Sequence, residues 1–92
     1  MTDQHQTEFV LTGVDPGSGD GAPANRRLVC LIEGGGKFAI WGRDGNTKHI
    51  DIVQAAGFPC TISCDWQEVP TWAHEKYGHT HWLEENAYMK VL

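Results

Sequence analysis

Residues 60–66 alternate strictly between apolar and polar side chains, and this alternation constrains the fold more than any other feature of the chain. Successive side chains of a β-strand point to opposite faces, whereas a helix repeats every ~3.6 residues. The segment is therefore predicted to be a strand that buries Cys60, Ile62, Cys64 and Trp66. The polar residues between them would face away from the core.

Six other segments are predicted to be short strands, because their apolar runs are bounded by turn-forming residues. They are residues 7–14, 27–33, 37–42, 48–53, 79–84 and 87–91. In the first of these, Phe9 and Leu11 share a face. Residues 27–33 are apolar on both faces, which indicates a central and fully buried strand.

The Asp-Gly pair at residues 44–45 predicts a hairpin between two of these strands. A three-residue loop sets Ile40 opposite Ile50, so that the apolar residues of both strands share one face. The alternative is a short helix over residues 50–56 that ends at Gly57.

A helix of about two turns is predicted over Thr71–Tyr77, because Pro70 suits the start of a helix and Gly78 suits its end. A helix this short is not stable alone and must pack on the sheet. Only one stripe of the helix can face the core, so either Trp72 or Tyr77 is expected to be exposed.

The last two predicted strands are expected to pair as a C-terminal hairpin. This pairing would set Trp82 opposite Met89. It would also bring His79, His81 and Tyr88 together on the opposite face.

Seven short strands and one helix in 92 residues predict one domain, mainly β, of the small α+β class. The expected architecture is a compact antiparallel β-barrel or a strongly curved sheet of six to seven strands, with the helix near residues 71–77. Residues 1–6 are expected to be frayed. The glycine- and proline-rich residues 15–25 are expected to form a flexible loop inside the domain.

Charge, hydropathy and cysteine content limit the possible partners and the cellular location of the protein. The net charge is −5, although residues 26–48 hold five basic and two acidic residues, a local charge of +3. An acidic chain argues against non-specific nucleic-acid binding. The longest apolar run, residues 28–32, is too short for a membrane span. An odd number of cysteines, with Cys60 and Cys64 too far apart on a strand to form a bridge, predicts a reducing, cytoplasmic location.

Three of the four tryptophans and three of the five histidines lie between residues 66 and 82. Large amphipathic rings supply much of the contact area at binding surfaces. We therefore expect a non-enzymatic binding or accessory module that self-associates, uses no cofactor, and takes a protein partner or a small flat ligand. Its surface would lie on the short helix and the C-terminal hairpin and comprise Trp72, Tyr77, His79, His81 and Tyr88.

The string His-x-His-x-x-x-Glu at residues 79–85 is similar to part of the first cupin metal motif. The resemblance implies a small metal-dependent enzyme that uses His79 and His81, which we keep as an alternative function. It covers seven residues, Ala73 stands where the motif has glycine, and no second histidine motif follows. A cysteine nucleophile is not expected, because all three cysteines lie in apolar strands, where burial would raise their pKa.

The basic middle segment suggests a second alternative. It contains five basic residues and a tryptophan that adjacent strands could bring together. These residues are Arg26, Arg27, Lys37, Trp41, Arg43 and Lys48. A charged groove with a stacking ring is the arrangement that single-strand binders use. A small barrel of this type would resemble an oligonucleotide-binding fold, so single-stranded nucleic-acid binding through residues 26–48 remains a candidate function.

Overall fold

Six strands and two short helices make up the computed structural model in the residues that it describes, 5–15 and 25–92. In chain order they are β1 His5–Val14, β2 Asn25–Ile32, β3 Lys37–Arg43, α1 Lys48–Ala56, β4 Cys60–Glu68, α2 Thr71–Tyr77, β5 His81–Leu83 and β6 Met89–Val91. The predicted frayed segment and flexible loop lie largely outside the described residues. Residues 5 and 6, which belong to β1, pair with β4.

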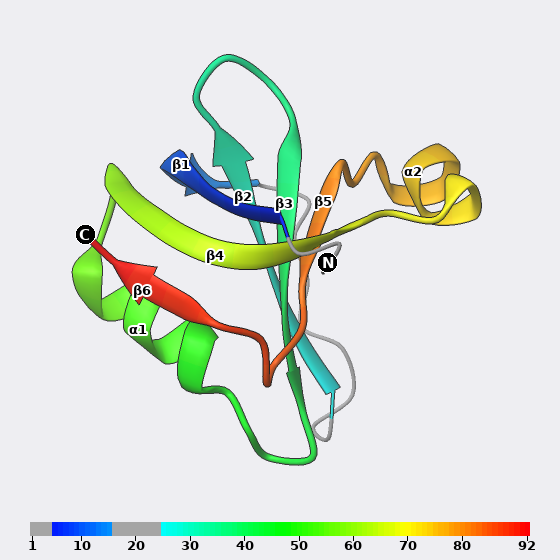
Figure 1. The fold of residues 1–92 in the computed structure, drawn as a ribbon. Coiled ribbons are helices and arrows are strands. Elements are labelled where there is room, and N and C mark those ends of the chain that lie inside the picture. Colours follow the sequence, from blue (N-terminus) through cyan, green and yellow to red (C-terminus); the bar gives the residue numbers. More distant parts are fainter. Residues whose placement is uncertain (1–4, 16–24) are drawn as a thin grey trace.

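The strands form a closed barrel with Greek-key order (Figure 1). β1, β2 and β3 are antiparallel neighbours, and β4 returns to pair with β1, which gives the spatial order 4-1-2-3. β5 closes the barrel between β3, to which it is parallel, and β4, to which it is antiparallel. β6 is an additional strand on β4. The predicted small β-barrel is therefore confirmed.

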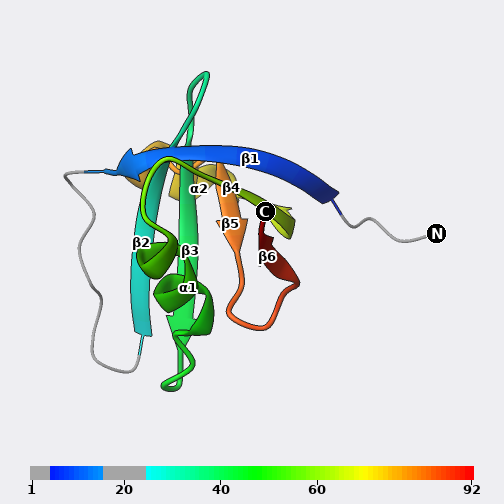
Figure 2. The same ribbon diagram turned by 90° about the vertical axis from the view of Figure 1, so that its left-hand side faces the viewer.

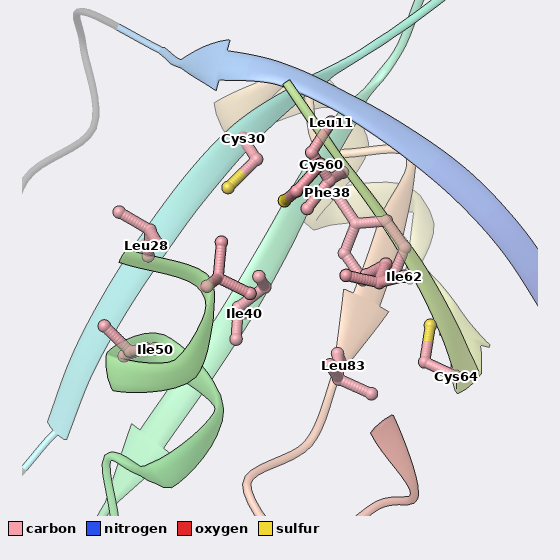
Figure 3. Close-up of a cluster of buried hydrophobic side chains, with 11 residues drawn as sticks. Leu11, Leu28, Cys30, Phe38, Ile40, Ile50, Cys60, Ile62, Cys64 and Leu83 are labelled. Atoms are coloured by element: carbon pink, nitrogen blue, oxygen red, sulfur yellow. The ribbon is translucent and has the colours of Figure 1, made fainter. Parts of the chain in front are cut away.

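Alternate side chains of the strands fill the barrel interior (Figure 3). Cys60, Ile62 and Cys64 of β4 are buried as the alternation predicted, and Trp66 is partly buried against the same cluster. The other members of the cluster come from the remaining barrel strands and α1: Leu11, Leu28, Cys30, Phe38, Ile40, Ile50, Val53 and Leu83.

The structure corrects the strand predicted over residues 48–53, which belong to the helix α1. Ile50 and Val53 lie one turn apart and are both buried in the core. Gly57, with a φ of 76°, ends the helix and donates its N–H to the Val53 carbonyl at 3.1 Å. The hairpin is impossible for a tertiary reason: β3 already uses both edges to pair with β2 and β5.

The predicted C-terminal hairpin is also wrong, because β5 and β6 pair with β4 and not with each other. Trp82 lies opposite Gln67, and Val91 lies opposite Ile62. β4 has nine residues, so both three-residue strands fit along one of its edges. Trp82 therefore does not meet Met89.

A second buried layer lies on the outside of the barrel. Val29 and Ala39 alternate with core residues and are buried although they point away from the core. α2 lies on this side of β3, with Ala73 fully buried, whereas α1 lies on the other side (Figures 1 and 2). Burial of both faces of β2 is thus confirmed for Leu28, Val29 and Cys30, whereas Leu31 and Ile32 are only partly buried. Of the two helices in the described part of the chain, neither has the length and apolar character to cross a bilayer.

Candidate binding surface

Three neighbouring strands each direct one large side chain to the outside of the barrel. Leu28, Ile40 and Leu83 face the core from β2, β3 and β5. Because side chains alternate along a strand, the adjacent residues Arg27, Trp41 and Trp82 point outward. The pairings of β2 with β3 and of β3 with β5 bring these three residues onto one face.

The helix α2 adds two rings to this face. The Trp72 ring centroid lies 6.2 Å from that of Trp82 and 6.3 Å from that of Tyr77. Trp82 in turn lies 5.4 Å from Trp41. All three contacts are edge-to-face, the geometry that aromatic pairs favour. We call the group the aromatic surface: Arg27, Trp41, Trp72, Tyr77 and Trp82.

The rings of the aromatic surface differ in exposure. Trp72 is 60% exposed and Tyr77 is 38% exposed, whereas Trp41 and Trp82 are partly buried beneath them. Either Trp72 or Tyr77 was expected to be exposed, and the structure shows that both are, because Ala73 is the residue of α2 that is buried against the barrel. Trp72 is therefore the ring most accessible to a ligand.

Three cations lie over these rings: Arg43, whose guanidinium carbon is 4.9 Å from the Trp41 ring centroid, and also Arg27 and Lys76. The Arg27 guanidinium carbon is 4.9 Å from the Tyr77 ring centroid and 5.6 Å from that of Trp41. The Lys76 ammonium is 5.2 Å from the Tyr77 centroid. Among the described residues, Arg27 and Lys76 pair with no carboxylate, so the charges of these two side chains are unpaired there.

Apart from Arg27, the cations of the basic middle segment are paired with carboxylates or lie off this face. Arg43 forms an ion pair with Glu84 and lies 3.7 Å from Glu85. Lys37 lies 3.6 Å from Asp15. Lys48 is exposed at the start of α1, and the side chain of Arg26 is outside the part of the structure that is described.

The five residues predicted to form the site do not all meet. Trp72 and Tyr77 are in contact, and His79 stacks on Tyr77 with ring centroids 5.3 Å apart. His81 instead packs inside the barrel against Phe9, Phe38 and Trp66. Tyr88 is 47% exposed but immediately precedes β6, which lies across the molecule from α2 (Figure 1).

The metal alternative finds no support in this geometry. The Trp82 indole donates a hydrogen bond to Nδ1 of His79 at 3.1 Å, which places His79 on the outer face. His81 is in register with the core residue Phe38, so the two imidazoles lie on opposite sides of the barrel wall. Within residues 5–15 and 25–92, no three His, Cys, Asp or Glu side chains gather closely enough to hold a metal ion.

The cysteines are not arranged for nucleophilic chemistry. Cys30, Cys60 and Cys64 are free thiols, and all are buried. Burial raises the pKa of Cys30 and of Cys64 to about 12 and also raises the pKa of Cys60. Because the thiolate is the reactive form, the raised pKa of each thiol disfavours nucleophilic attack at neutral pH.

Sequence reasoning missed Trp82 as a surface residue because the incorrect hairpin paired it with Met89. Arg27 and Trp41 were grouped with the basic segment, but nothing in the sequence joined them to the aromatic helix. The alternation of side chains along a strand could have identified Arg27, Trp41 and Trp82 as outward-facing, since each of them is next to a core residue in the sequence. No family model, curated protein or solved structure matches this chain. Function is therefore argued from the chemistry of the side chains.

Proposed function

We propose that this protein is a non-enzymatic module that binds single-stranded nucleic acid across the aromatic surface. The observation that carries the proposal is the meeting of two segments distant in sequence. Arg27 and Trp41 of the basic segment contact Tyr77 and Trp82 of the aromatic segment. Aromatic rings for base stacking with adjacent cations for the backbone are what single-strand binding requires.

The location of the surface on the barrel supports the same function. Five-stranded Greek-key barrels of the oligonucleotide-binding type bind ligands on the face of strands 2 and 3 and on the loops between strands 1–2 and 4–5. The aromatic surface includes Arg27 of β2 and Trp41 of β3, and α2 lies in the connection between β4 and β5. This likeness is one of fold alone, so the side chains carry the functional argument.

Stacking, more than phosphate neutralisation, would supply the affinity. The chain carries a net charge of −5. Of the cations over the aromatic surface, only Arg27 and the neighbouring Lys76 have no carboxylate partner in the described residues. Two phosphate contacts on a single strand predict a log–log salt slope of about −1.4. Such a slope is shallow for a nucleic-acid binder.

Trp72→Ala tests the proposal. Loss of a stacking ring costs about 1–3 kcal/mol per base, so we expect the affinity for a fluorescein-labelled oligothymidylate to fall by roughly 5- to 150-fold. The measurement is fluorescence anisotropy at several salt concentrations, with far-UV circular dichroism to verify the fold.

Tyr88→Ala is the matched control, because Tyr88 is an exposed ring remote from α2. We expect this substitution to leave binding unchanged. Equal losses in the two variants would contradict the proposal. Absence of oligonucleotide binding by the unsubstituted protein at low salt would also contradict it and would favour the protein partner or small flat ligand expected from the sequence.

Two further expectations concern the cellular compartment and the oligomeric state of the protein. Three buried free cysteines fit a reducing compartment such as the cytoplasm. Self-association stays a prediction, to be measured by analytical ultracentrifugation.

A further inference from the structure

His79 lies directly beneath the aromatic surface and connects α2 to the barrel. It is only 2% exposed, in the connection between Gly78 at the end of α2 and the start of β5. Its carbonyl oxygen lies 2.9 Å from Nδ1 of His74 on α2. Its ring stacks on Tyr77, and its Nδ1 lies 3.1 Å from the indole nitrogen of Trp82 on β5.

The hydrogen bond between Trp82 and His79 fixes the protonation state of the imidazole. An indole N–H can only donate, so Nδ1 of His79 must be the acceptor. The ring is then neutral, with its proton on Nε2. Protonation would add a hydrogen to Nδ1, which would then point at the hydrogen of the indole N–H. The hydrogen bond between Trp82 and His79 would be lost.

The groups around His79 favour the neutral ring. Burial is the main cause of a pKa below the ordinary value of 6.5, and the positive charges of Arg27 and Lys37 add to it. Asp15 opposes the shift but is paired with Lys37. The charged and titratable groups that face the ring come from β2, β3, the end of β1 and α2: Arg27, Lys37, Asp15, His74 and Tyr77.

We infer that His79 is a proton switch for the aromatic surface. Neutral His79 holds the Trp82 indole in the arrangement that binds the strand, and protonation releases this ring and weakens binding. This inference rests on the proposed function. It makes the binding of single-stranded nucleic acid dependent on pH through one residue that need not touch the ligand.

The direction of the effect separates the switch from simple electrostatics. Acidification makes an acidic protein less negative, which by itself strengthens its attraction to phosphates. The switch predicts the opposite, weaker binding at lower pH. A single linked proton changes Kd by at most about tenfold per pH unit. We therefore expect oligothymidylate to bind about three- to tenfold more weakly at pH 5.0 than at pH 7.5.

His79→Asn is the decisive variant. The asparagine carbonyl oxygen takes the place of Nδ1 as an acceptor for the Trp82 indole, and it does not titrate. Anisotropy titrations with oligothymidylate, whose bases do not ionise between pH 5.0 and 7.5, should show no weakening in this variant at low pH. Trp82→Phe provides a second test that does not depend on the folding of His79→Asn: without the indole hydrogen, the Kd ratio between the two pH values should fall towards one.

The outcomes separate the switch from the proposed function. If the unsubstituted protein binds equally or more tightly at pH 5.0, the switch is wrong and single-strand binding stands. If His79→Asn weakens at low pH as much as the unsubstituted protein, another residue takes up the proton and the switch is wrong. If oligothymidylate does not bind at any pH, the proposed function fails and the switch fails with it. Circular dichroism at both pH values verifies that the barrel stays folded.

Discussion

At the scale of single residues, His81 places an ionisable ring inside the barrel. Its ring centroid lies 4.4 Å from that of Trp66 and 4.9 Å from that of Phe9, and it stacks on Phe38 at 5.5 Å. Thr80 supplies a hydroxyl 2.8 Å from its Nδ1. An imidazole in this position serves mainly as a flat packing group, which explains why His81 forms no site with His79.

The pH dependence of stability follows from this placement. Burial lowers the pKa of His81 below 6.5, so the neutral ring stabilises the fold above about pH 6.5. That stability is lost as the pH falls through the lowered pKa, and His79 acts in the same direction. We expect the free energy of unfolding, measured with urea, to be smaller at pH 5.0 than at pH 7.5. His81→Phe should reduce this decrease, and an unchanged decrease would show that His81 does not cause it.

At the scale of elements, α1 shows how a short apolar run can be ambiguous. Ile50 and Ile52 have the spacing of a strand, whereas Ile50 and Val53 have the spacing of a helix. Periodicity over so few residues does not separate the two. The helix is decided by the absence of a free β3 edge and by Gly57, which adopts a conformation that ends it.

Gly57→Ala tests that ending. With φ of 76° and ψ of −179°, Gly57 lies in a region essentially restricted to glycine, so a side chain should cost about 1–3 kcal/mol of stability. A Cβ at this position meets no atom within 4 Å, and the cost would therefore come from the backbone alone. Gly13→Ala is the control, since that Cβ also meets open space and its φ is outside the left-handed region. Equal urea midpoints for the two variants would contradict the explanation.

At the scale of the whole molecule, the barrel and the aromatic surface share strands but use opposite faces of them. Phe38 is fully buried, and β3 pairs on one side with β2 and on the other with β5. Core residues of these strands therefore determine whether the outer rings are assembled at all. Exposed rings such as Trp72 contribute little to closure of the barrel, so their part in the proposed binding can be tested separately from stability.

Phe38→Ala and Trp72→Ala should separate stability from binding. Truncating a buried phenylalanine costs about 3–5 kcal/mol, a large part of the stability of a small domain. Trp72→Ala should cost less than about 1 kcal/mol, because Trp72 is 60% exposed. Urea unfolding measures both values. A similar destabilisation by the two substitutions would mean that α2 is part of the structural core.

The sequence by itself determined the features that depend on neighbouring residues. Alternation identified the buried residues of β4, and Pro70 with Gly78 bounded α2 at the correct residues. The mainly β barrel followed from the number of short strands. The acidic composition, by contrast, gave no indication that Arg27 lies over the rings of Trp41 and Tyr77.

Only the tertiary structure decided which strands pair and which side chains meet. β5 and β6 both lie on β4, and this arrangement carries Trp82 to the face of Trp41 and separates Tyr88 from Trp72. Local periodicity fixes the face of a strand but not its partner, since the partner depends on closing the barrel and burying both sides of β2 and β3. The aromatic surface belongs to that long-range arrangement, because its residues come from four elements between residues 27 and 82.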